Sequence, residues 1–326
     1  MQWYLRRWAS GCARRAGWMV AMNVLVTGGR GTVGAPLCAE LRRRGHNVWV
    51  CDLMHAPATN YMRCDIGDSR QLARVMDAAQ PELVYHLAAE FGRWNGEDYY
   101  ERVWATNAIG TKHLLRQQEA RRFRLVFTSS SEVYGDFEGL MSEAVLAQHP
   151  IRQLNDYAIS KWVNEQQIMN SADRHATETV RVRLFNTYGP GEYYNEYRSV
   201  ACQFIYRALH GLPYTVYLNH HRTSSYIDDT VCTLANLADA GRFIAGNAYN
   251  IAGAEYHDIK QLSDLVLRLT GRDDSRVQYV EREAHNTLNK RGDLTNASRD
   301  LGHVARFDLA AGVPLTIAWQ RRVYGV

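Results

Sequence analysis

Residues 23–34 have the sequence NVLVTGGRGTVG, and this stretch decides the fold. Its first residues are apolar and largely β-branched, as in a buried strand, and helical periodicity begins at its end. Gly28 permits a tight turn, Gly31 lets the backbone approach a diphosphate closely, and Gly34 allows the helix to pack against the strand. The free N–H groups at the start of that helix would face the phosphates. The stretch therefore predicts a dinucleotide-binding loop.

The alternation of strand and helix continues through the first half of the chain. Strands are expected at residues 23–27, 47–51, 82–87, 124–129 and 178–183, and helices at 34–44, 70–79, 102–120 and 157–171. This order predicts an α/β fold of the Rossmann type, a doubly wound parallel sheet whose strand ends converge on one ligand crevice. From about residue 183 the pattern loosens, with helices expected at 204–211 and 259–270, which indicates a smaller C-terminal substrate-binding lobe.

We therefore expect the chain to have three parts. Residues 1–21 would be a disordered basic extension, or would precede a second start at Met22; a basic, Trp-containing surface anchor is the alternative. Residues 22–185 would form the dinucleotide-binding domain. Residues 186–326 would be mainly the substrate-binding lobe, with some segments returning to the first domain.

Composition limits the partners of the protein. The formal charge is +4, but residues 1–21 contain four arginines and no acid, so the remaining residues carry equal numbers of basic and acidic side chains. A neutral body argues against binding a nucleic acid backbone, and no apolar run is long enough to span a bilayer. The six cysteines lack metal-binding spacing and no secretory signal is apparent, so we expect no metal and a cytoplasmic location.

Acidic residues follow the second expected strand and the segment after it. Asp52 lies 18 residues after Gly34. A carboxylate there can accept both ribose hydroxyls of the cofactor and repels a 2′-phosphate, so NAD is expected rather than NADP. Asp65, with Ile66 after it, is a second candidate that would face the adenine. Capping a loop is the alternative role for each carboxylate.

Tyr157 and Lys161 are the expected catalytic pair. They lie four residues apart, on one face of the predicted helix. A phenol with a pKa of about 10 is a poor base at neutral pH, and a fixed ammonium nearby favours the phenolate. The phenolate can take a hydroxyl proton while a hydride leaves the same carbon for NAD. Ser130, at the end of another strand, can hydrogen-bond the reacting oxygen.

Five segments together resemble the extended short-chain dehydrogenase/reductase superfamily, in its nucleotide-sugar epimerase/dehydratase branch. They are the glycine loop at 28–34, HLAA at 86–89, NAIGT at 107–111, SEVYG at 131–135 together with Tyr157 and Lys161, and RLFNTYGP at 183–190. The resemblance extends over about residues 22–324. It implies NAD as the cofactor, a nucleotide-diphosphate sugar as the substrate, and a homodimer formed through helices 102–120 and 157–171.

The resemblance also assigns ligand contacts by position. Residues 87–89 would line the path of the cofactor, Asn107 would lie near the nicotinamide side, and Lys161 would also hold the nicotinamide ribose. The expected cofactor contacts are Gly28, Gly31, Thr32, Val33, Gly34, Asp52, Asp65, Ile66, Leu87, Ala88, Ala89, Asn107, Tyr157 and Lys161. The expected substrate contacts are Ser130, Ser131, Asn186 and Arg222. A guanidinium such as that of Arg222 suits a diphosphate because it donates two parallel hydrogen bonds.

Residues 130–136 have the sequence SSEVYGD, and its second and third residues, Ser131 and Glu132, bear on the reaction. In 4,6-dehydratases the position of Ser131 resembles an Asp that protonates the leaving hydroxyl, and a serine hydroxyl is a very weak acid. Glu132 is a catalytic candidate that can act at the C5 hydrogen or near a C6 carboxylate, as in the similar UDP-glucuronate decarboxylases. Those typically have Arg after the Gly-Pro, where this chain has Gly191.

C4 epimerisation needs no acid or base at Glu132, so it is the reaction favoured from the sequence. Decarboxylation, and a dehydration that uses Glu132 at C5, are the alternatives. A non-catalytic NAD sensor or a nucleic-acid-binding relative would be a different class of protein on the same fold. Such relatives usually lose the Tyr/Lys pair or gain a basic face, and this chain does neither.

Overall fold

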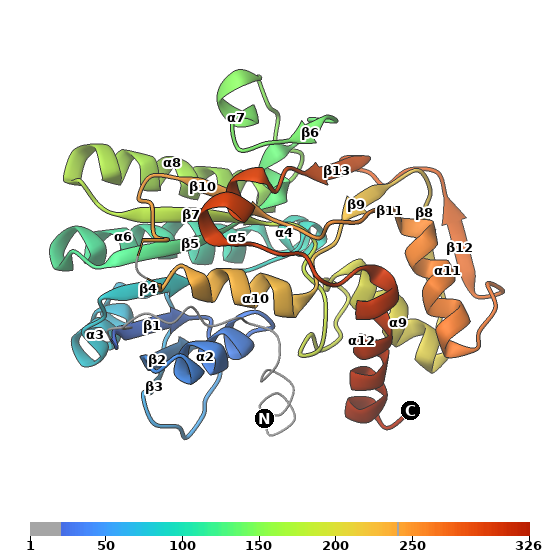
Figure 1. The fold of residues 1–326 in the computed structure, drawn as a ribbon, viewed down its shortest axis with the longest axis horizontal. Helices are drawn as coiled ribbons and strands as arrows, with labels where there is room; N and C mark the ends of the chain where they lie inside the picture. Colours follow the sequence, from blue (N-terminus) through green and yellow to red (C-terminus); the bar gives the residue numbers. More distant parts are fainter. Residues whose placement is uncertain (1–20, 240) are drawn as a thin grey trace.

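The computed structural model describes residues 21–239 and 241–326, and the basic extension expected at residues 1–21 lies outside the described residues except for Ala21. A seven-stranded sheet in the order β10-β7-β5-β4-β1-β2-β3 runs through its centre, and every neighbouring pair is parallel (Figure 1). The strands are β1 (Asn23–Thr27), β2 (Asn47–Asp52), β3 (Tyr61–Arg63), β4 (Leu83–His86), β5 (Arg124–Ser130), β7 (Thr179–Leu184) and β10 (Ala248–Ile251). The predicted Rossmann-type sheet is confirmed.

Helices cover both faces of this sheet because successive strand residues point to opposite sides. Val24 and Val26 belong to a core shared with α2 (Gly34–Arg43) and α10 (Ile227–Asn236). Leu25, between them, belongs to a second core. The helices that contribute to this second core are α3 (Ser69–Ala79), α6 (Gly110–Arg121) and α8 (Asp156–His175). Figure 1 shows α2 and α10 on one side of the sheet and α6 and α8 on the other.

The expected helix at 102–120 is one continuous helical stretch with an irregular centre. It consists of α5 (Tyr100–Val103), a π-helical segment (Trp104–Ile109) and α6. A π segment inserts one wide turn into a helix and is frequent near functional sites. This segment contains Asn107, so the irregular turn changes where that side chain points.

The C-terminal lobe combines three helices with two small sheets. The helices are α9 (Val200–His210), α11 (Ile259–Thr270) and α12 (Leu309–Tyr324). Strands β8 (Tyr214–Tyr217) and β12 (Val277–Val280) pair in parallel. A second sheet, in the order β11-β9-β13-β6, contains β11 (Tyr256–Asp258), β9 (His221–Thr223), β13 (Asn289–Gly292) and β6 (Leu140–Met141). Because β6 comes from the first half of the chain, this sheet joins the lobe to the body.

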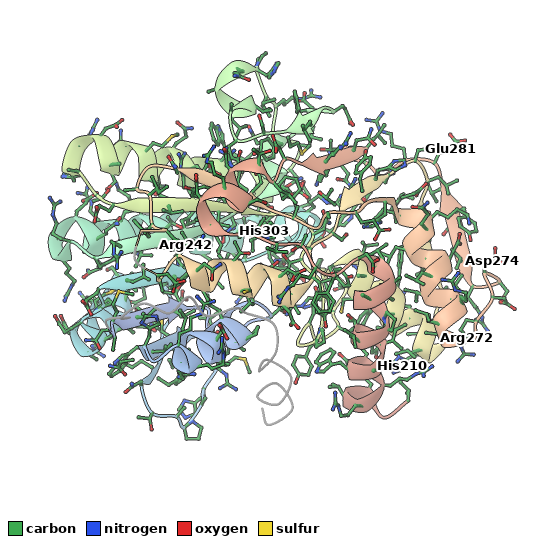
Figure 2. The ribbon with its side chains drawn as sticks, in the orientation of Figure 1. His210, Arg242, Arg272, Asp274, Glu281 and His303 are labelled. Atoms are coloured by element: carbon green, nitrogen blue, oxygen red, sulfur yellow. The ribbon has the colours of Figure 1, made fainter. Side chains whose placement is uncertain are left out.

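Two elements of the second half return to the main sheet. Strand β10 pairs with β7 at the sheet edge, and α10 packs beside α2. His303, labelled in Figure 2, connects these two elements. Its ring hydrogen-bonds Thr233 on α10 and the carbonyl of Ala252 just after β10, both at 2.8 Å. The two halves of the chain are therefore interleaved rather than sequential.

Two searches of the described ranges, 21–239 and 241–326, gave negative results. None of the helices there combines the length and apolar character that crossing a bilayer requires. No group of three or more His, Cys, Asp or Glu side chains in those same ranges is placed to hold a metal ion.

Candidate active site

A cavity of about 380 Å³ lies at the carboxyl ends of the parallel strands, where ligands bind in open α/β sheets. Its walls contain almost all of the cofactor contacts expected from the sequence. They include Gly28, Gly31, Thr32, Val33, Gly34, Asp52, Asp65, Ile66, Leu87, Ala88, Ala89, Tyr157 and Lys161. These residues come from the ends of four strands, β1 to β4, and from the first turns of α8 (Asp156–His175), and the fold brings them to one crevice.

The glycine loop has the close packing that a dinucleotide requires. Gly28 has a φ of +67°, and a Cβ there would lie 2.7 Å from the backbone nitrogen of Ala88. A Cβ on Gly34 would lie 2.3 Å from the carbonyl oxygen of Gly28, so both positions exclude a side chain. Val33, the N-cap of α2, makes no side-chain cap hydrogen bond, so the first N–H groups of α2 are left without that partner. This arrangement fits a diphosphate at the helix N-terminus.

The two carboxylates that are expected to contact the ribose and the adenine, those of Asp52 and Asp65, line the cavity. Asp52 ends β2 and accepts a hydrogen bond from the backbone N–H of Arg30 at 3.0 Å. Asp65 accepts one from the N–H of Gly67 at 2.8 Å, which holds the turn after β3. Asp52 therefore ties the end of β2 to the glycine loop, Asp65 stabilises its own turn, and both residues line the cavity.

Asn107 lies behind the cavity wall, which Thr106 forms at this point. Its amide oxygen accepts the N–H of Glu90 at 2.9 Å, and its amide nitrogen donates to the carbonyl of Glu90 and to Ser160 Oγ, both at 3.0 Å. The side chain is fully occupied by these three bonds. Asn107 thus ties the loop after β4 to the helix that carries Tyr157.

Tyr157 and Lys161 lie on the first turns of α8, which Asn155 caps by accepting the N–H of Ala158 at 2.8 Å. Lys161 Nζ donates to the carbonyl of Thr128 at 2.9 Å and lies 5.9 Å from the centre of the Tyr157 ring. Burial raises the pKa of Tyr157 to about 12, against a hydrogen bond with Ser130 that lowers it. Burial also lowers the pKa of Lys161 to about 8.

These pKa values differ from the expectation that Lys161 lowers the pKa of Tyr157. The physical reason is desolvation: the phenolate would be buried, and the ammonium of Lys161 is directed at the carbonyl of Thr128. In the protein alone Tyr157 is therefore a neutral phenol that bonds Ser130. A positive charge bound beside the phenol would favour its ionisation.

A buried ion pair supports α8 one turn beyond Lys161. Glu165 accepts from Arg183 at 2.8 and 3.0 Å and from Ser129 Oγ at 2.6 Å. Burial opposes the ionisation of Glu165, but the charge and hydrogen bonds of Arg183, the hydrogen bond from Ser129 and the charge of Arg181 together lower the pKa of that carboxyl. The negative charge of Glu165 raises the pKa of Lys161 and so favours its ammonium form. The sequence gave no local signal for this pair, whose members lie on different elements.

A second cavity of about 680 Å³ adjoins the first and extends into the C-terminal lobe. Ser130 and Tyr157 line both cavities, so the expected reacting groups lie where a cofactor and a substrate would meet. Ser131 and Asn186 also line the second cavity. The amide oxygen of Asn186 is buried and has no hydrogen-bond partner in the part of the chain that the structure describes. Such an atom fits a ligand hydroxyl or amide as its partner.

Five of the charged side chains in the wall of the second cavity interact with one another; we call these five the charge cluster. They are Arg93, Glu132, Arg222, Glu283 and Lys290. Glu132 forms an ion pair with Lys290, and its carboxylate lies 3.8 Å from Arg93 Nε. Lys290 and Arg222 are 2% and 4% exposed, so two cations are almost removed from water.

The pKa values in the charge cluster follow from its cations. Burial opposes the ionisation of Glu132, but Lys290, Arg93 and Arg222 outweigh it and hold its pKa at about 2. Burial lowers the pKa of Lys290 to about 8, against the charge of Glu132 that raises it. Arg222 is fixed by its Nη1, which donates to the carbonyls of His221 and Leu288 at 2.8 Å. Glu132 is therefore a fixed carboxylate, and it is surrounded by cations.

Sequence reasoning identified Glu132 and Arg222 but missed Glu283 and Lys290. Neither missed residue lies in a recognised segment, and their distance from Glu132 along the chain exceeds that of any local pattern. Strand pairing accounts for the position of Lys290. Strand β13 pairs with both β6 and β9 and so brings Lys290 beside Arg222.

This layout serves hydride chemistry on a ligand hydroxyl, and it defines a dinucleotide-dependent enzyme of the short-chain dehydrogenase/reductase class. The chain belongs to the NAD dependent epimerase/dehydratase family, whose model matches residues 24–252. The protein is thus an NAD-dependent enzyme of a nucleotide-sugar family that contains epimerases, dehydratases and decarboxylases.

Individual relatives differ in the reaction that their names give. The chain is 28% identical over 309 residues to UDP-glucuronic acid decarboxylase 1 of Xenopus tropicalis, covering 92% of this chain and 72% of that one. Its structure resembles an epimerase from Methanothermobacter thermautotrophicus, with a TM-score of 0.86, 26% identity and 94% of each chain covered. It also resembles MoeE5 in complex with UDP-glucuronic acid and NAD, with a TM-score of 0.82, 28% identity, and 92% and 99% covered.

Proposed function

We propose that this protein is an NAD-dependent decarboxylase of a nucleotide-linked hexuronate, a sugar whose C6 is a carboxylate. The observation that carries the proposal is the charge cluster, in which Arg93, Arg222 and Lys290 surround Glu132. Three cations against the two carboxylates of the cluster leave an excess positive charge, and two of the cations, Arg222 and Lys290, are buried. A carboxylate on the bound sugar balances that charge, whereas a neutral hexose leaves it unbalanced.

The comparisons support an acidic sugar. One similar protein is a UDP-glucuronic acid decarboxylase, and a similar solved structure contains UDP-glucuronic acid with NAD. Both cover at least nine-tenths of this chain. The segment of Ser131 and Glu132, which resembles these decarboxylases, also forms the centre of the charge cluster.

We assign the first cavity to NAD, held by the glycine loop, by Asp52 at the ribose and by Lys161. When bound, NAD supplies a hydride acceptor and a positive charge beside Tyr157. Tyr157 then takes the proton of the C4 hydroxyl, which Ser130 orients by a hydrogen bond. The Tyr157 phenol, a weak acid in the protein alone, becomes a base only when that positive charge is present.

Loss of CO₂ follows from a C4 ketone, which lies β to the C6 carboxylate. The C5–C6 bond breaks, its electron pair forms an enolate towards C4, and Ser130 with protonated Tyr157 hydrogen-bonds the enolate oxygen. Glu132 has a pKa of about 2 and cannot supply the proton that C5 needs. Lys290, an ammonium with a pKa of about 8 in the same cavity, can supply it. If bound NAD accepts and returns the hydride at C4, the protein's part of the cycle would end when Tyr157 gives its proton back to the C4 oxygen and Lys290 takes up a proton from solvent to replace the one given to C5.

C4 epimerisation, the reaction favoured from the sequence, uses Tyr157 and Ser130 in the same way. It requires neither Glu132 nor Lys290, so it gives no reason for a buried ion pair beside the sugar. It is the main competing outcome of the test.

The test is mass spectrometry of the products that purified enzyme forms, with NAD added, from UDP-glucuronate, UDP-glucose, dTDP-glucose and GDP-mannose. The proposal requires loss of CO₂ from UDP-glucuronate and no change in the neutral sugars. A new isomer of unchanged mass would make the protein an epimerase, and loss of water would make it a dehydratase. Either result, without loss of CO₂, contradicts the proposal.

A further inference from the structure

Arg93 and Glu283 meet across the second cavity from opposite halves of the molecule. Arg93 begins α4 (Arg93–Asp98), in the body, and Glu283 lies in the loop between β12 and β13, in the lobe. Glu281, labelled in Figure 2, marks the beginning of that loop. Arg93 Nη2 donates to Glu283 at 3.0 Å, and the carboxylate also accepts from Trp94 Nε1 at 3.1 Å and from Asn286 Nδ2 at 2.8 Å.

Arg93 differs from the other two cations of the charge cluster in what holds it. Arg222 donates to two backbone carbonyls, and Lys290 contacts Glu132 directly. Arg93 instead pairs at 3.0 Å with Glu283, a carboxylate in a loop of the lobe, and lies 3.8 Å from Glu132. A carboxylate of a ligand can replace a carboxylate partner with no change in charge, whereas a hydroxyl cannot.

We propose that Arg93 determines specificity by binding the C6 carboxylate of the sugar, and that Glu283 is its counter-ion until the substrate replaces it. The inference rests on the proposed function, because it requires an acidic sugar in this cavity. Exchange of one carboxylate for another keeps the buried charge of Arg93 balanced. A neutral sugar that displaced Glu283 would leave the guanidinium with only Glu132, which lies 3.8 Å away and already pairs with Lys290. The pair thereby favours an acidic substrate and disfavours its neutral analogue.

The test compares UDP-glucuronate with UDP-glucose by calorimetric titration of the NAD-loaded enzyme. All proteins carry Tyr157→Phe, so that turnover does not disturb the binding signal. Arg93→Met should weaken UDP-glucuronate binding by about 10- to 100-fold, the range of one charge-assisted hydrogen-bonded contact, and change UDP-glucose binding by less than about twofold. Glu283→Gln should have the opposite effect on this affinity and strengthen UDP-glucuronate binding, because it removes the anion that competes for Arg93.

Arg152→Met is the matched control, since the Arg152 side chain is 81% exposed and pairs only at 3.8 Å with Asp136. A thermal melt of each variant verifies folding, and Glu283→Gln tests the idea separately if Arg93→Met does not fold. Equal weakening of both ligands by Arg93→Met, or weaker UDP-glucuronate binding in Glu283→Gln, would overturn the inference. If either of these results is obtained while the enzyme without substitutions decarboxylates UDP-glucuronate, the proposed function is retained and only this inference is wrong. If that enzyme neither prefers UDP-glucuronate to UDP-glucose nor decarboxylates it, the proposed function and this inference are both wrong.

Discussion

The two cavities of this enzyme differ in the residues that determine their shape and charge. The first contains the glycine loop, in which Gly28 and Gly34 are packed so closely that no Cβ fits. The second is lined by long charged side chains that come from the body and the lobe together. The first therefore depends on local chain geometry, and the second on charge balance between distant segments. This difference separates what is common to the family from what selects a substrate.

Replacing Tyr157 by Phe should have the largest effect, because Tyr157 lies where the two cavities meet. Turnover of the confirmed substrate should fall by about a thousandfold, within the range for loss of a general acid–base group. NAD binding should be unchanged, since the phenol oxygen is not part of the glycine loop. Steady-state kinetics and NAD titration measure the two quantities. Normal turnover by the variant would remove Tyr157 from the chemistry.

Glu132→Gln tests the second cavity alone. It removes the anion that pairs with Lys290 and leaves three cations with only Glu283 to balance them. We expect decarboxylation to fall by about a hundredfold, the range of one well-placed electrostatic group, while NAD binding is retained. An epimerase would be spared by this change. A variant that isomerises its substrate at the normal rate would therefore point to epimerisation.

Gly34→Ala tests the first cavity alone. The new Cβ would lie 2.3 Å from the carbonyl oxygen of Gly28, so α2 must move away from the loop. Overpacking of this kind costs about 1–3 kcal/mol, and we expect NAD affinity to fall by about tenfold. Fluorescence titration with NADH measures it. Gly139→Ala is the control for overpacking outside the first cavity: Gly139 is exposed, and its new Cβ would lie 2.7 Å from the end of the Phe137 ring. It should bind NADH normally, and an equal loss there would show a general effect on stability.

The smallest effect should be a pH dependence of the ligand preference of the second cavity. Burial lowers the pKa of Lys290 to about 8, so its ammonium loses a proton as the pH rises through that value. The preference for UDP-glucuronate over UDP-glucose should then decrease by a few-fold, about 0.5–1 kcal/mol, as expected for one partly compensated charge. Lys290→Arg keeps its charge at every pH tested and should remove the dependence. Paired binding titrations across this pH range measure the ratio, and a ratio that stays constant in the unmodified enzyme would contradict the prediction.

Most of the first cavity could be predicted from the sequence because its parts are local. The strand at 23–27, the glycines and Asp52 lie within one β-α-β unit, where turn geometry and spacing determine the contacts. Asn107 is the instructive exception. The sequence places it on a regular helix beside the nicotinamide, whereas the π segment turns its amide towards Glu90 and Ser160.

The second cavity could not be predicted to the same extent because pairing between distant strands creates it. Glu132 and Lys290 are 158 residues apart and meet only because β13 pairs with β6 and β9. Glu283 lies in a loop with no motif. The absence of Arg at Gly191 weakened the resemblance to decarboxylases, yet Arg93 and Lys290 supply cations from other elements.

The return of β10 to the main sheet has a consequence for the order of assembly during synthesis. The walls of the first cavity are complete once Arg198 has been made, and six strands of the sheet precede that point. Strand β10 and then β13, with Lys290, emerge later. The residues that line the first cavity are therefore made before α10 and β10, which complete the packing of the sheet that carries them. A ligand that binds the folded chain stabilises it by mass action, so NAD bound in the first cavity would also stabilise the contacts that these late segments make.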